Sequence, residues 1–81
     1  MPINSEGNMD RIVIEPAIKI ILDEIHTKLD EAARVAKAAK ACAETGAINE
    51  GVTVSMEIEQ LIYEAGRLGD AASLLNRLAD E

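Results

Sequence analysis

Apolar residues recur along this chain in two arrays that each step by four and then by three positions. This spacing keeps one stripe of an α-helix turned towards a partner helix. The sequence therefore predicts two long amphipathic helices. The first array consists of Ile18, Leu22, Ile25, Leu29, Ala32, Ala36, Ala39 and Ala43, and the second of Val54, Ile58, Leu61, Ala65, Leu68, Ala72, Leu75 and Ala79.

The first helix is predicted from about residue 16 to residue 45, with Pro16 in its first turn and Gly46 as the left-handed residue that ends it. The second is predicted from about residue 53 to residue 79, with Thr53 or Ser55 as its N-cap. Helices of similar length with so short a connection must fold back on each other. The expected fold class is all-α, an antiparallel helical hairpin that spans residues 11–81.

The chain before the first helix divides into two parts. Residues 1–10 are polar, which predicts a mobile N-terminal segment. Residues 11–15 include three β-branched residues and precede Pro16, which disfavours helical conformation in the residue before it. We therefore expect residues 11–15 to be extended.

Residue size differs between the two ends of the predicted hairpin. Alanines of the first helix face larger residues near the loop, so the helices can approach closely there. At the open end large residues face large ones, and the apolar surface is too broad for two helices to enclose. A homodimeric four-helix bundle is the expected cover, with residues 12–14 or another protein as alternatives. The predicted oligomer seam comprises Ile18, Leu22, Ile25, Leu29, Ile58, Leu61, Leu68 and Leu75, and the candidate partner surface comprises Ile20, Ile21, Leu74, Leu78 and Tyr63.

The chain has 15 acidic and eight basic residues, which give a formal net charge of −7. Such a balance repels phosphate backbones and anionic lipid, so we expect neither nucleic-acid nor membrane binding. The single cysteine, Cys42, cannot form an internal disulfide, and residues 1–10 lack the basic region of a secretory signal. These features favour a cytoplasmic location.

Candidate chemistry is sparse. Asp23, His26 and Asp30 share one side of the first helix, and a dimer could complete a metal site there, although an ordinary structural role is favoured. Cys42 lies near a helix C-terminus, where the helix dipole opposes a thiolate. Gly66 and Gly69 interrupt the second helix and suggest close helix packing, or alternatively a hinge. No catalytic or cofactor-binding residue is expected.

The sequence therefore favours a non-enzymatic helical protein that acts through protein–protein association, as a self-associating adaptor, regulator or secretion-type co-chaperone. The alternative is an acidic antagonist of a basic partner, such as an antitoxin or a nucleic-acid mimic. A metal site at Asp23, His26 and Asp30 is the third possibility. The partners expected are a second copy of the chain and another protein.

Overall fold

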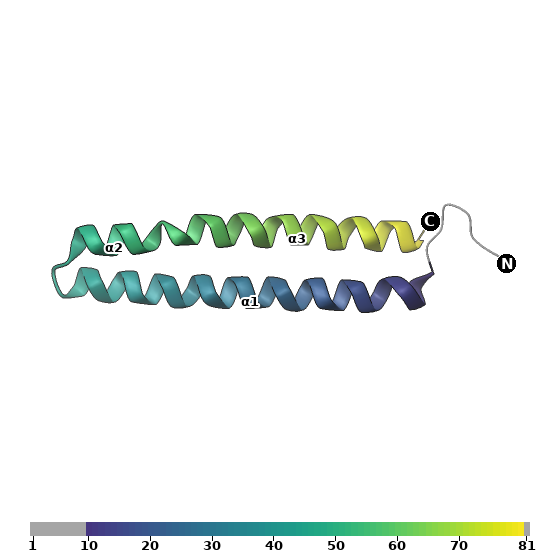
Figure 1. The fold of residues 1–81 in the computed structure, drawn as a ribbon, viewed down its shortest axis with the longest axis horizontal. Coiled ribbons are helices and arrows are strands. Elements are labelled where there is room, and N and C mark those ends of the chain that lie inside the picture. The colour runs from purple at the N-terminus through teal and green to yellow at the C-terminus, as the bar shows by residue number, and fades with distance from the viewer. Residues whose placement is uncertain (1–9, 81) are drawn as a thin grey trace.

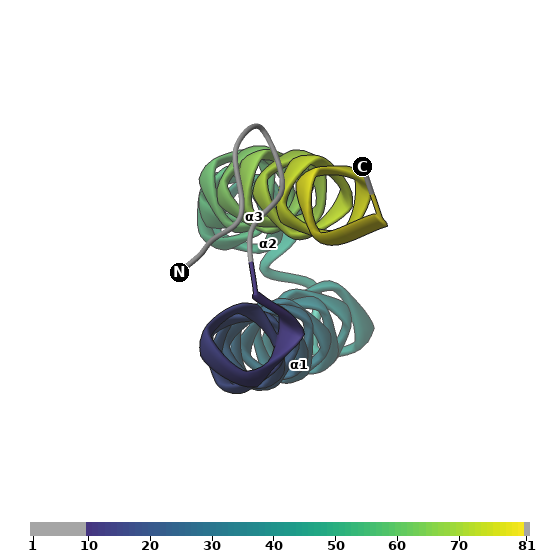
Figure 2. The ribbon, with the colours of Figure 1, turned by 90° about the vertical axis from the view of Figure 1, so that its right-hand side faces the viewer.

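The computed structural model describes residues 10–80, so the predicted mobile segment lies outside the described residues except for Asp10. Three helices follow in order: α1 (Arg11–Glu44), α2 (Ile48–Ser55) and α3 (Glu57–Asp80). α2 and α3 lie end to end and run antiparallel to α1 (Figure 1). The Cα atoms form a rod of 65 × 15 × 11 Å. The view along the rod shows the helices stacked in two layers (Figure 2), so the predicted all-α hairpin is confirmed.

The N-terminal part of α1 differs from the prediction. Residues 11–15 are helical, and Pro16 lies inside α1. The carboxylate of Asp10 accepts a hydrogen bond of 2.9 Å from the backbone N–H of Ile12, which caps the helix. Ile14 is only 2% exposed, and Arg11 forms an ion pair of 2.5 Å with Asp80 at the far end of α3. The cap and these contacts with α3 outweigh the local preference of the residues before Pro16.

The connection between the helices is shorter than predicted. Gly46 has φ of 92° and is the left-handed residue expected there. The next helix begins at Ile48, and the hydroxyls of Thr53 and Ser55 do not cap it, contrary to the prediction. They donate instead to the carbonyls of Asn49 and Val52, at 3.0 and 2.7 Å, within α2. Met56 then separates α2 from α3.

The two predicted seams differ in how closely they match the interface of the structure. Every member of the second array is buried or half-buried, as expected for the interface with α1. In α1 only half of the predicted residues turn towards the partner, and Leu22, Leu29, Ala36 and Ala43 are exposed beside the interface. The positions preceding these four replace them. The α1 interface consists of Ile14, Ile18, Ile21, Ile25, Lys28, Ala32, Val35, Ala39 and Cys42.

The core of the hairpin is small. Among the described residues, the buried apolar side chains are those of Ile14, Ala32, Leu61, Ala65 and Ala72, and three of these are alanines. α2 and α1 approach closely near the loop, where a Cβ on Gly51 would lie 2.8 Å from the carbonyl oxygen of Ala39. Within residues 10–80, no helix is both long enough and apolar enough to cross a membrane.

Candidate protein-binding surfaces

On one broad side of the hairpin, the positions next to the seam carry no charge between Leu22 and Ala43 of α1 and between Ile48 and Gly69 of α2 and α3. In an antiparallel helix pair, the positions next to the seam fall on two opposite sides of the pair. On the first side, successive turns of both helices present aliphatic or small residues. We call this the uncharged side, and it consists of Leu22, Leu29, Ala36 and Ala43 from α1 with Ile48, Ser55, Ile62 and Gly69 from α2 and α3.

Large apolar side chains on the uncharged side are open to solvent. Leu22 is 53% exposed, Leu29 is 44% exposed and Ile62 is 50% exposed. An open hollow lies beside Ile62 at the junction of α2 and α3, and Glu59 borders this part of the uncharged side. The hollow is lined by Ser55, Met56, Ile58, Glu59, Ile62 and Tyr63. Scattered exposed leucines are ordinary on a protein surface, but a continuous uncharged strip along two helices is typical of a binding surface.

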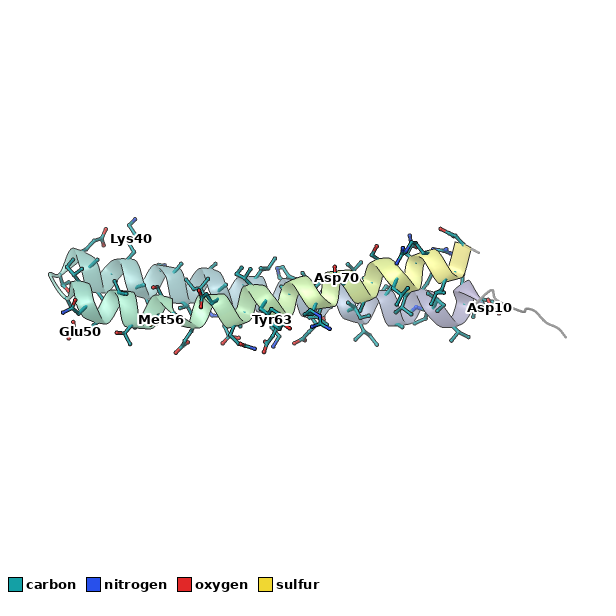
Figure 3. The ribbon with its side chains drawn as sticks, turned by 90° about the horizontal axis from the view of Figure 1, so that it is seen from above. Asp10, Lys40, Glu50, Met56, Tyr63 and Asp70 are labelled. Atoms are coloured by element: carbon teal, nitrogen blue, oxygen red, sulfur yellow. The ribbon has the colours of Figure 1, made fainter. Side chains whose placement is uncertain are left out.

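The opposite side is acidic. We call it the glutamate side, and it carries Glu24 and Glu31 from α1 with Glu50, Glu57 and Glu64 from α2 and α3. The two sides are separated in Figure 3, where Lys40, one turn from Ala36 and Ala43, lies at one edge and Glu50 at the other. The fold gathers these five from both helices onto one side.

An ion pair on the glutamate side joins the two helices. Lys28 occupies a position in the α1 interface, and its Nζ lies 2.8 Å from an Oε atom of Glu64 in α3. A hydrogen bond from the Gln60 amide and another from Lys28 hold the pKa of the Glu64 carboxyl below its usual value. The bond to Glu64 raises the pKa of Lys28. The lysine stem can pack at the interface while its ammonium reaches the edge.

Tyr63 is 58% exposed and lies beside this ion pair. Arg67 donates a hydrogen bond of 2.8 Å to the tyrosine Oη, and its guanidinium carbon lies 5.8 Å from the ring centroid. A shallow groove runs between these residues and α1, lined by Glu24, Lys28, Gln60, Tyr63, Glu64, Arg67 and Leu68.

The predicted partner surface at the open end is only partly exposed. Ile20 is 70% exposed and Leu74 is 47% exposed, whereas Ile21 and Leu78 are half-buried against the other helix. Ile20 lies one turn from Glu24, and Leu74 lies one turn from Leu78, so both belong to the apolar end of the glutamate side. Ile12 and Val13, in the first turn of α1, are 81% and 67% exposed, so the open end offers a larger apolar surface than Ile20 and Leu74 alone.

Gly66 and Gly69 do not serve close packing within the hairpin. A Cβ built on either glycine would meet no atom within 4 Å, which contradicts the expectation that they bring α3 close to α1. Gly69 belongs to the uncharged side and Gly66 lies one turn from it. Both glycines therefore lie on the outside of the hairpin, where they leave space beside α3.

The candidate metal cluster is not assembled by the fold. Asp23, His26 and Asp30 are all exposed on α1, and Asp30 pairs with Arg34 at 2.5 Å. Within the described part of the chain, no three His, Cys, Asp or Glu side chains come together in a way that could hold a metal ion. Cys42 is half-buried in the α1 interface near the loop.

Comparisons of the chain with protein-family models, with curated proteins and with solved structures find no match.

Sequence reasoning missed Lys28 and the uncharged side as functional candidates. The spacing of the fully apolar line through Leu29 predicts a seam that excludes Lys28. The sequence nevertheless carried a signal for the uncharged side. Three neighbouring lines of residues, each repeating every seven positions along α1, are mainly apolar, and a single partner helix covers only two of them. They start at Ile18, Ile21 and Leu22. The third line, from Leu22 to Ala43, is the α1 half of the uncharged side.

Proposed function

We propose that this chain is a non-enzymatic helical hairpin that acts by binding protein, both a second copy of itself and another protein. The observation that carries the proposal is the uncharged side, where Leu22, Leu29 and Ile62 remain exposed along two helices. An adaptor, a small regulator or a secretion-type co-chaperone in the cytoplasm is the kind of protein this surface suits. The resemblance to such proteins is one of shape alone.

The small core supports the same proposal. Within residues 10–80 of this 81-residue chain few large side chains are buried, and small domains with so little core usually gain stability from oligomerisation or another added constraint. A partner on the uncharged side would supply a second layer of packing. Association and folding would then be coupled, since a partner that binds only the folded state stabilises that state.

Thermal unfolding of the full chain, followed by helical circular dichroism, tests this proposal. Where association stabilises the hairpin, the midpoint rises with protein concentration. We expect such a rise. A stably folded monomer with a midpoint independent of concentration would contradict it, because the exposed leucines would then need no cover.

The glutamate side favours a second candidate function, the acidic antagonist of a basic partner. Five glutamates from two helices face one way, which is the arrangement that a charge-based antagonist requires. Two of these glutamates, Glu24 and Glu64, form ion pairs with Lys28, which reduces the negative charge available to a basic partner.

Binding to poly-lysine as a function of salt tests the second candidate. Glu31→Gln with Glu57→Gln removes two charges from the glutamate side, and Glu59→Gln with Asp70→Asn removes two charges from elsewhere. The antagonist function requires that the first pair weaken binding more than the second. Equal weakening would show attraction to overall net charge alone.

A further inference from the structure

We infer that the uncharged side is the surface through which two copies of this chain pack face to face, leaving the glutamate side free. This inference rests on the proposed function and assigns its self-association to one surface. The two copies are related by a two-fold axis, so each contributes Leu22, Leu29 and Ile62 to the same interface. The result is a four-helix bundle of two antiparallel hairpins.

Charge selects this side for a second copy. Each chain has a net charge of −7, so two copies repel each other at long range. Contact through the glutamate sides would place five glutamates of each copy against the same five of its partner. Like charges forced together across an interface cost several kcal/mol. Contact through the uncharged sides brings no charged residue of either set into the centre.

The uncharged side is long enough for two copies to contact over several helical turns. It runs from Leu22 to Ala43 along α1, which is about 32 Å at 1.5 Å per residue. Leu29 lies near the middle of α1, and the ion pair between Lys28 and Glu64 places Ile62 at a similar height in α3. Central positions of this kind usually dominate binding.

This arrangement gives a physical reason for glycine at positions 66 and 69. A glycine inside a helix is less favourable than alanine, and Gly66 and Gly69 give no compensating contact within the hairpin. In the dimer they allow the partner helix to approach α3 closely, beside Ile62. Small residues next to large ones are what interlocking helices require.

Sedimentation equilibrium of the full chain and three single variants tests the inference. Leu29→Asp places a charge at the centre of the proposed interface, and Ile20→Asp, at a more exposed isoleucine on the opposite side, is its matched control. We expect a dimer for the wild type. Leu29→Asp should raise the dissociation constant by about a hundredfold, whereas Ile20→Asp should change it by no more than about twofold.

Gly69→Ala keeps the test informative if Leu29→Asp fails to fold. Alanine has space at this position in the hairpin and is a better helix former, so the monomer should be at least as stable. In the dimer the added methyl group meets the partner helix. We expect Gly69→Ala to weaken dimerisation by about tenfold while helical content is preserved.

Three results would overturn the inference, and they separate it from the proposed function. A dimer that Ile20→Asp dissociates, and that Leu29→Asp and Gly69→Ala leave intact, assembles through the other side. A partly unfolded monomer means that a different protein covers the uncharged side. In both of these cases protein binding stands as the function. A stably folded monomer at all concentrations overturns the inference and the proposed function together.

Discussion

The two broad sides of this hairpin are built from the same helices, in positions that differ by a few residues in the sequence, and yet their chemistry is opposite. Ala36 and Ala43 belong to the side that carries no charge, and Glu24 and Glu31 belong to the side that gathers glutamates. Within a single hairpin neither side is buried. The contrast therefore cannot come from the packing of α1 on α3, and it indicates that the two sides meet different surroundings.

The largest expected effect comes from adding a carboxylate to the uncharged side, compared with adding one to the glutamate side. Ala36→Glu adds a carboxylate to the uncharged side, and Ala38→Glu adds one to the glutamate side. Both alanines are exposed in the middle part of α1. We expect Ala36→Glu to weaken dimerisation by about a hundredfold, because a charge would be buried without a partner, and Ala38→Glu to have little effect. Sedimentation equilibrium measures both, and equal effects would remove the distinction between the sides.

A second prediction compares a glycine inside the hairpin with one outside it. Gly51→Ala would place a methyl group 2.8 Å from the carbonyl oxygen of Ala39, which is backbone and cannot easily move. We expect a loss of about 1–3 kcal/mol in the free energy of unfolding. Gly66→Ala meets open space in the hairpin and should raise the stability of the monomer by up to about 1 kcal/mol.

These two glycine variants are best measured by urea unfolding at a series of protein concentrations. Any effect on dimerisation then appears as a dependence on concentration, which separates it from the effect on the hairpin. If Gly51→Ala were as stable as its parent, the close approach of α2 and α1 near the loop would be contradicted.

The sequence predicted α3 better than α1, and the reason lies in how many apolar lines each helix carries. In α3 one seam is apolar, so Ile58, Leu61 and Ala65 could be placed by spacing alone. In α1 the interface contains the residues in line with Ile18 and Ile25 together with one neighbouring line. Spacing favoured the fully apolar neighbour through Leu29, but in the structure the line through Lys28 lies in the interface. Only tertiary contacts, namely the ion pair to Glu64 and the burial of Ile14, decide between them.

The same limit applies to the candidate surfaces. Periodicity could show that α1 carries more apolar surface than one helix covers, and it located Ile20 and Leu74 as exposed residues. It could not show which side holds the surplus, since that depends on the register between α1 and α3. It also assigned Gly66 and Gly69 to the inside of the hairpin, because a glycine in a sequence does not reveal which way it faces.

Salt should act in opposite ways on the two sides, with a smaller effect than the substitutions. Added salt screens the repulsion between two chains of net charge −7, and it leaves apolar contacts in place. We expect dimerisation to hold or to strengthen a few-fold as salt is raised. Binding of a basic protein to the glutamate side should weaken over the same range. A dimer that dissociates as salt rises would indicate that ion pairs, not the uncharged side, hold it together.

The smallest expected effect is the pH dependence that Lys28 and Glu64 give to the hairpin itself. The pKa of Glu64 is lowered in the folded state, so its contribution is present above the unfolded value, near 4.5, and is lost as pH falls through the folded value. The pKa of Lys28 is raised, so its contribution is present below 10.5 and is lost as pH rises through the higher folded value. Both groups lie at the edge of the interface, where solvent screens the pair, so the effect is small.

Thermal unfolding across this pH range, at a fixed protein concentration, measures the pair. Glu64→Gln should lower the midpoint at neutral pH, and the difference from its parent should shrink in acid as the parent carboxylate becomes protonated. Glu57→Gln removes one charge from the same side and leaves the pair intact, so its smaller effect gives the baseline. A difference for Glu64→Gln that stays constant down through the acid range would mean that the ion pair does not join α1 to α3. Some other contact would then have to fix the register between α1 and α3, which separates the uncharged side from the glutamate side.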